Sequence, residues 1–166
     1  MRLTMFSDYA LRVLLVLATR TDALVTISDI ASAFEISDAH LTKVAHVLGK
    51  TGWIATVRGR NGGMRLEADP RKLRLGEVVR RLEADFALVE CFGVDNRCIL
   101  TGGCGLERAL ELALAAFFAE LDRYTLADLV NTSPALNALP MWQPVSWSGG
   151  RGAVAPARPR RRAPAG

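Results

Sequence analysis

The stretch "TISDIASAFEISDAHLTKVAHVLGKTGWIATVRGRNGGMRLEADP", residues 26–70, decides the fold. In two parts of it, "TISDIASAF" and "SDAHLTKVAHVLGKTG", apolar residues recur at i, i+3, i+4 and i+7, the spacing of an amphipathic helix. Thr26 or Ser28 can cap the first helix and Ser37 the second, because a hydroxyl there accepts a hydrogen bond from an unpaired amide. Two short capped helices separated by a tight turn predict a helix-turn-helix.

A β-hairpin is expected directly after the second helix. "WIATV" (53–57) has strand composition, and "MRLE" (64–67) returns after "GRNGG" (59–63), whose glycines and asparagine suit positive-φ positions. Pro70 ends the hairpin. A helix-turn-helix followed by a hairpin is the winged-helix arrangement, so the predicted fold class is mainly α with a small β-hairpin wing.

Three further helices are expected around this motif. Residues 5–20 are apolar nearly all round, which predicts burial on most sides, and residues 74–83 form an amphipathic helix. Residues 105–130 predict one long helix with Leu110, Phe117 and Tyr124 at intervals of seven. Such a seam favours pairing with a second helix, as in a homodimer, although a core helix folded back on its own domain gives the same pattern.

Charge and composition divide the chain into three parts. Residues 1–81 carry 13 Lys/Arg against 8 Asp/Glu, residues 82–130 carry 3 against 9, and residues 131–166 carry 5 Arg and no acid. The expected units are a DNA-binding domain (1–85), a loop with the dimerisation helix (86–130) and a disordered Pro/Arg-rich tail (131–166). With neither a signal peptide nor an apolar run long enough for a bilayer, a cytoplasmic protein without a membrane partner is expected.

The basic first half indicates a polyanionic partner, double-stranded DNA. The second helix of the motif places short, polar and basic residues opposite its apolar side, Ala39 and Lys50 among them, where they can reach base edges and phosphates in a major groove. The wing adds arginines that can enter a minor groove, Arg65 among them. Any one of these side chains could equally be an ordinary solvated residue; the combination predicts DNA binding. The candidate DNA contacts are Ser28, Ser37, His40, Thr42, Lys43, His46, Arg58, Arg60 and Asn61.

All three cysteines lie in one glycine-rich stretch, "ECFGVDNRCILTGGCGLE", at Cys91, Cys98 and Cys104. Zinc sites favour pairs two to four residues apart, and these gaps are wider, so an iron–sulfur cluster is the leading interpretation. Zinc and a thiol redox switch remain alternatives. Three thiolates leave a four-cysteine cluster one ligand short, and the fourth could come from Glu90, Asp95, Glu107 or a partner subunit.

Several motifs together resemble one known family. They are the head "MRLTMFSDYALRVLLVLA", the helix-turn-helix, the wing "RGRNGGMRL", "LGEVVRRLE", the three loop cysteines and "TLADLV", covering about residues 1–132. This is the family of dimeric winged-helix iron–sulfur repressors that contains IscR, RirA and NsrR. Within it, IscR-type members carry a histidine where this chain has Glu107, and RirA-type members lack the acid of the head motif.

"FSDYALR" most resembles the head of the nitric-oxide-sensing NsrR group. That resemblance implies a cluster, [4Fe–4S] favoured over [2Fe–2S], held by Cys91, Cys98 and Cys104 and by Asp8 of the partner subunit. It implies a homodimeric repressor that releases its operator when nitric oxide attacks the cluster. A regulator of the same fold that responds to iron or redox state is the alternative. An enzyme is not expected, because no nucleophile–base pair or phosphate-binding loop in its proper context is present.

Overall fold

The computed structural model describes residues 2–20 and 23–137, and the rest of the predicted tail, 138–166, lies outside the described residues. The described chain is mainly helical with one two-stranded antiparallel sheet, which confirms the predicted fold class. Its elements are α1 (Met5–Ala18), α2 (Ile27–Phe34), α3 (Asp38–Lys50), β1 (Ile54–Val57), β2 (Gly63–Leu66), α4 (Leu75–Leu82), η1 (Glu90–Phe92), α5 (Gly105–Leu121), α6 (Leu126–Asn131) and α7 (Pro134–Asn137).

Helix α1 forms the centre of the core. It packs against α3, α4, α6 and β2, and half of its residues are buried, as its all-round apolar sequence predicted. Leu14 and Leu17 are fully buried there, together with Leu41 and Leu48 of α3. The apolar face of α3 is therefore directed at α1, which leaves its polar face outward.

The helix-turn-helix forms with the predicted caps at both helix starts. Thr26 caps α2 in a reciprocal capping box with Asp29, whereas Ser28 is an exposed residue inside the helix. Ser37 caps α3 and accepts from the amide of His40. Glu35 ends α2 in the left-handed region, at φ 54°, which sharply reverses the chain between the two helices.

The wing pairs β1 with β2 in the register Ile54↔Leu66 to Val57↔Gly63. Val25 adds a bridge on the other side of β2, with Val25–Met64 N···O distances of 2.9 and 2.7 Å. Among the residues of the predicted tip "GRNGG", only Gly59 has a positive φ, 115°, so the expectation for Asn61 is wrong. Gly62 serves close approach instead, because a Cβ there would lie 2.3 Å from the carbonyl oxygen of Val57.

The predicted continuous helix over residues 105–130 is wrong, because the chain turns between α5 and α6. Thr125 and Asp128 form a second capping box that starts α6. Arg74 also pairs with Thr125 as an isolated bridge, and α6 then packs on α1. Tyr124 consequently lies outside both helices, and the heptad seam ends with α5.

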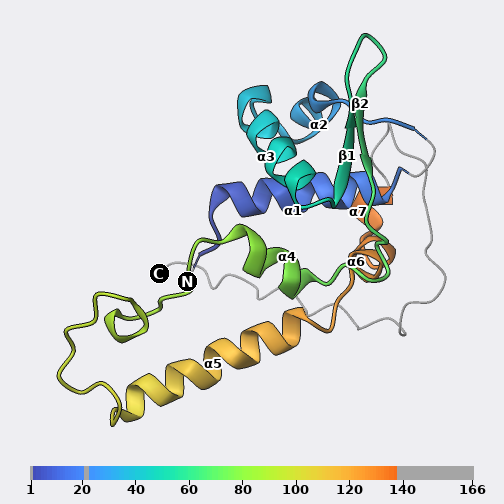
Figure 1. Ribbon diagram of the computed structural model, residues 1–166. Coiled ribbons are helices and arrows are strands. Elements are labelled where there is room, and N and C mark those ends of the chain that lie inside the picture. The colour runs from blue at the N-terminus through green and yellow to red at the C-terminus, as the bar shows by residue number, and fades with distance from the viewer. Residues whose placement is uncertain (1, 21–22, 138–166) are drawn as a thin grey trace, which may run out of the picture.

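Figure 1 shows the arrangement that follows. The helix-turn-helix and the wing lie on one side of α1, while α5 and the loop before it extend on the opposite side, beyond α4. Among the described residues, no helix is both long and apolar enough to cross a bilayer. The part of the predicted tail that is described, residues 131–137, holds the end of α6 and α7.

Candidate nucleic-acid interface and metal centre

The outward face of α3 carries the predicted groove contacts. His40, Thr42, Lys43 and His46 are all exposed, and they alternate with the buried Leu41, Val44, Ala45 and Leu48 of the inner face. The wing tip presents Arg58, Arg60 and Asn61, also exposed. Arg65 is partly neutralised, because its guanidinium lies 3.3 Å from a carboxylate oxygen of Glu67.

Local hydrogen bonds orient the start of α3. The Ser37 hydroxyl lies 2.9 Å from Nδ1 of His40, which leaves Nε2 as the outward nitrogen of that ring. The His40 ring also contacts Tyr9 of α1, with ring centres 6.1 Å apart. Thr42 donates its hydroxyl to the carbonyl of Asp38 at 2.7 Å, so toward an external group it can only accept. Ser37 and Thr42 are thus exposed, and each also forms a hydrogen bond that stabilises the start of α3.

The three cysteines are free and half-buried. Cys91 lies in η1, Cys98 in the following loop, and Cys104 at the N-cap of α5. Desolvation and then the nearby charges of Glu107, Cys98 and Cys104 raise the pKa of the Cys91 thiol.

Side-chain hydrogen bonds hold the loop, and spacing in the sequence gave no sign of them. Asn96 accepts from the amide of Cys98 at 2.8 Å and donates to the Thr101 hydroxyl, which itself donates to the carbonyl of Cys98. Glu90 accepts from the amide of Arg97 at 3.1 Å. Glu107 accepts from the amide of Gly102 at 2.9 Å, and Gly102 takes φ 83°, a conformation that glycine adopts freely.

The donor set fits an iron–sulfur cluster that lacks one ligand. The three thiols sit in one loop with no disulfide among them, and a shallow cavity of about 480 Å³ beside Cys91 also exposes Glu107 and Glu111. Within residues 2–20 and 23–137, however, no three His, Cys, Asp or Glu side chains are placed to hold a metal ion together. The described loop thus supplies three free thiols without closing a coordination site.

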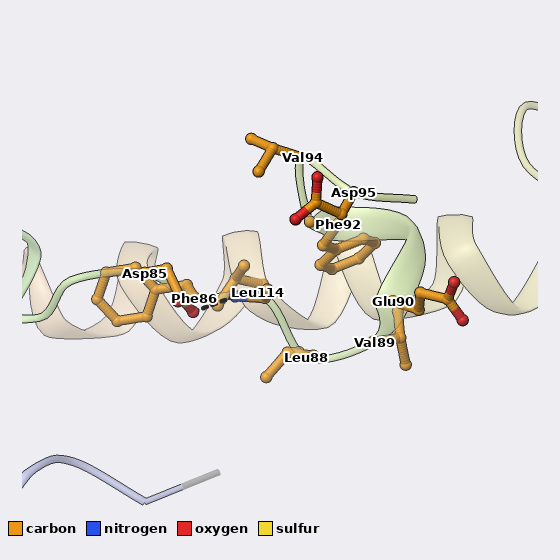
Figure 2. A pocket seen from close by; sticks show the side chains of 11 residues that line it. Asp85, Phe86, Leu88, Val89, Glu90, Phe92, Val94, Asp95 and Leu114 are labelled. Carbon is orange, nitrogen blue, oxygen red and sulfur yellow. Dashed lines mark hydrogen bonds between the residues drawn. The ribbon is translucent and has the colours of Figure 1, made fainter. Parts of the chain in front are cut away.

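A second, larger groove of about 840 Å³ runs between the cysteine loop and α5. Figure 2 shows Phe86 and Leu114 side by side at one end and Phe92 over the helix at the other. Helix α5 itself has no buried residue in the described chain, and Leu106 and Leu112 are 63% and 61% exposed. An apolar helix so little covered by its own chain marks an interaction surface.

Asp8 lies in the first turn of α1, and the described structure does not place it with the cysteines. Its Oδ2 lies 2.7 Å from Nη2 of Arg12, one turn along the same helix. The Arg12 guanidinium carbon in turn lies 5.5 Å from the ring centre of Phe34 in α2 and 6.0 Å from that of Tyr9. Because Tyr9 contacts His40, Asp8 is connected by contacts to both helices of the helix-turn-helix.

Two joints connect α4 to its neighbours, and sequence reasoning missed both. Glu83, just after α4, accepts from the amide and the hydroxyl of Thr4, the N-cap of α1, at 2.8 and 3.2 Å. Arg80, in the last turn of α4, forms a bidentate ion pair with Asp122, the C-cap of α5. The partners are 79 and 42 residues apart, so no local pattern could have indicated these contacts.

Comparison with known proteins gives a consistent picture. The family model Rrf2, described as an iron-dependent transcriptional regulator, matches residues 3–132. The HTH-type transcriptional regulator NsrR of Bacillus licheniformis is 52% identical over 132 residues, which cover 78% of this chain and 92% of that protein. A putative transcriptional regulator from Listeria innocua matches in structure with a TM-score of 0.65 and 27% identity, covering 80% of this chain and 88% of that one. The cysteine regulator CymR of B. subtilis, at 24% identity and a TM-score of 0.64 over 78% of this chain and 95% of that one, shares the fold.

Proposed function

The chain belongs to the Rrf2 family of iron-dependent transcriptional regulators, and we propose that it is a homodimeric DNA-binding repressor that senses nitric oxide through an iron–sulfur cluster. The observation that carries the proposal is the gathering of three free thiols in one loop between a winged helix-turn-helix and an exposed helix. The relatives are transcriptional regulators, in agreement with the prediction that the chain is not an enzyme.

The DNA-binding part of the proposal is supported by the outward face of α3. The helix presents His40, Lys43 and His46 to solvent, while the basic wing tip lies on the same side of α1. A dimer would place two such helices in successive major grooves of a near-palindromic operator. The arginines of the wing would lie over the adjacent minor groove or backbone.

The proposed cluster is held by Cys91, Cys98 and Cys104 of one subunit and by Asp8 of the partner subunit, with [4Fe–4S] favoured over [2Fe–2S]. When bound, the cluster would supply an iron atom with a weak oxygen ligand, the kind of iron that nitric oxide attacks. The chain's own contribution is the loop, whose backbone is fixed by the side chains of Asn96 and Glu107.

The homodimer is supported by the uncovered surface of α5. Leu106 and Leu112 of the helix are largely exposed, as are Val94 and Ile99 of the loop. The groove of Figure 2 lies along the same helix. A second copy of the chain would cover these apolar residues, and it would bring its own Asp8 to the loop.

The response of the DNA-binding face would depend on Asp8. If Asp8 were a ligand in the partner subunit's site, its carboxylate would be drawn away from Arg12, and a released carboxylate would pair with Arg12 as it does in the described structure. Arg12 contacts Phe34 and Tyr9, and Tyr9 contacts His40 at the start of α3. A shift of Arg12 therefore reaches the recognition helix through two direct contacts, and a displacement of a few ångströms is enough to lose base contacts.

The decisive experiment is anaerobic purification followed by an absorbance spectrum and by iron and sulfide analysis. We expect a coloured protein, and a colourless zinc protein would overturn the proposal. Operator binding of the loaded protein should be lost on titration with nitric oxide but not with an iron chelator. The reverse result would favour the iron-responsive alternative, which the family's iron-dependent description supports.

Single substitutions then test the ligand set. Cys98→Ala should abolish both the colour and nitric-oxide-sensitive operator binding, and a variant that kept both would contradict the proposal. Asp8→Asn should leave the three-cysteine site but alter its spectrum and its reaction rate with nitric oxide. Asp95→Asn is the matched control, because Asp95 is an exposed carboxylate within the loop itself. If Asp95→Asn rather than Asp8→Asn changed the spectrum, the fourth ligand would be assigned wrongly.

A further inference from the structure

A hollow of about 390 Å³ lies between the C-terminal half of α3 and strand β1. Of its lining residues, His46 and Lys50 belong to the face of α3 that was predicted to reach DNA, and the others were not predicted. Lys50 is the last residue of α3, Gly49 precedes it, and Thr56 belongs to β1. The hollow thus lies between α3 and the base of the wing, beside the face of α3 that is proposed to contact DNA.

The chemistry of the hollow favours an anion. His46 and Lys50 are exposed and lie one helical turn apart on the same face, and Lys43 continues that row toward the helix start. The described lining includes no carboxylate; its other polar side chain is the Thr56 hydroxyl, a hydrogen-bond donor. The full charge of Lys50 outweighs the partial negative charge at the C-terminus of α3.

Gly49 has no evident role inside the protein. Apart from its chain neighbours and the backbone of its own helix, a Cβ added to it would meet no atom within 4 Å, and its φ is not in the left-handed region. Glycine destabilises a helix relative to alanine, so a glycine that serves neither a turn nor internal packing needs another explanation. A position open to solvent, at the floor of a basic hollow, suits the close approach of an external group to the helix backbone.

We propose that this hollow receives one backbone phosphate of the bound DNA. Lys50 supplies the charge, His46 and Thr56 can each donate a hydrogen bond, and Gly49 provides the clearance. The inference rests on the proposed DNA-binding function and adds a site to it. Such a contact fixes the register of α3 in the groove without reading a base, because phosphate contacts position a protein whereas base contacts specify the sequence.

Fluorescence anisotropy with two labelled duplexes tests the site. One duplex is selected from random sequence by the wild-type dimer, and the other is its scrambled version. Lys50→Ala removes one phosphate contact from each subunit of the proposed dimer, so it should reduce the steepness of log K against log salt by about 1.8, which corresponds to about a 60-fold loss of affinity at 0.1 M salt. The loss should be similar for both duplexes. Lys72→Ala, an exposed lysine in the turn before α4, is the matched control and should leave the slope unchanged.

Substitutions of Gly49 distinguish a phosphate held in the hollow from a general effect of positive charge. Gly49→Ala should leave the melting temperature unchanged or higher, yet weaken binding to both duplexes, and Gly49→Leu should weaken it further. If Gly49→Ala and Lys50→Ala bound DNA like the wild type, or if Lys72→Ala lost as much as Lys50→Ala, the proposal would be overturned. If the wild-type protein bound neither duplex, the DNA-binding function itself would fail, and the site with it.

A methylphosphonate scan of the selected duplex identifies the occupant. Neutralising one phosphate per half-site should weaken the wild type but not Lys50→Ala, and this pairing would assign that phosphate to the hollow. A second experiment measures the binding of inorganic phosphate alone. If it bound with a dependence on Lys50 and Gly49 while duplex affinity did not depend on them, the hollow would be a small-anion site and the proposal would be wrong.

Discussion

The contact between Gly76 and Asp122 offers a sharp test of how the DNA-binding domain is joined to α5. Gly76 lies in the first turn of α4, and a Cβ there would stand 2.0 Å from Oδ1 and 2.8 Å from Cγ of Asp122. Gly76→Ala must therefore displace the Asp122 carboxylate. That carboxylate is held by both Nη atoms of Arg80, whose guanidinium lies 4.4 Å from the ring centre of Phe118.

The expected change in the free energy of unfolding combines three contributions, from the ion pair, the cation–π contact and the replacement of a helical glycine. The Arg80 and Asp122 side chains are 44% and 36% exposed, so solvent screens their pairing to about 0.2–1 kcal/mol. The cation–π contact that the pairing orients contributes about 0.5–1 kcal/mol more. Against this loss, replacing a helical glycine by alanine stabilises by roughly 0.5–1 kcal/mol. Gly76→Ala should thus be destabilising on balance, by about 0.6 kcal/mol at the middle of these ranges and by up to about 1.5 kcal/mol.

The sign should reverse when Asp122 is removed first. In an Asp122→Ala background, the nearest remaining neighbour of the new Cβ is Nη1 of Arg80, at 3.2 Å, the free end of a flexible side chain. Only the gain from replacing a helical glycine by alanine then remains, and Gly76→Ala should stabilise the protein by roughly 0.5–1 kcal/mol. Urea unfolding of the four metal-free proteins, at one protein concentration, completes the double-mutant cycle. An equal effect of Gly76→Ala in both backgrounds would refute the steric reasoning.

Three further outcomes are expected. The hydrogen bond from Arg80 lowers the pKa of Asp122 in the folded protein below the unfolded value of 3.8. The ion pair therefore stabilises the fold above pH 3.8, and this stabilisation is lost as the pH falls through the lower, folded-state pKa. The stability difference between wild type and Asp122→Asn, followed by urea unfolding, should therefore shrink from pH 6 to the acid limit, and a difference independent of pH would contradict this. Gly63→Ala should destabilise by about 1–3 kcal/mol, because its Cβ would lie 2.9 Å from the Val25 carbonyl in the bridge to Met64; unchanged unfolding would contradict it. Thr26→Ala should cost about 1 kcal/mol and Ser28→Ala less than about 0.5, as thermal melts would show, and equal costs would contradict the assigned cap.

Much of the DNA-binding half could be predicted because its determinants are local. The caps of α2 and α3 and the apolar spacing of their inner faces lie within one or two turns of each other, so the sequence contains the whole signal. The cysteines could be grouped for the same reason, since residues 91–104 form one loop.

The break between α5 and α6 was not predicted because two local signals conflict. The apolar seam continues through Tyr124, while Thr125 and Asp128 form a capping box that starts a new helix. The bridge from Thr125 to Arg74 supports the break, and its partner lies far away in the sequence. The hydrogen bonds of Asn96 and Glu107 in the cysteine loop were missed for a related reason, because an irregular loop has no period from which to predict them.

The joint at Asp122 also bears on how a change at the cysteine loop reaches DNA. Among the described elements, α5 packs chiefly on α4, and α4 packs on α1, which carries α3. The ion pair of Arg80 with Asp122 lies at the first of these steps, and the hydrogen bonds of Glu83 with Thr4 lie at the second. If this route carries the signal, the Gly76→Ala/Asp122→Ala protein should stay folded and bind DNA, but its affinity should change less between the loaded and metal-free forms. If the change in DNA affinity between the loaded and metal-free forms matched that of the wild type, the coupling would run instead through Asp8 and Arg12 across the dimer. Arg12→Ala should then abolish that change in affinity.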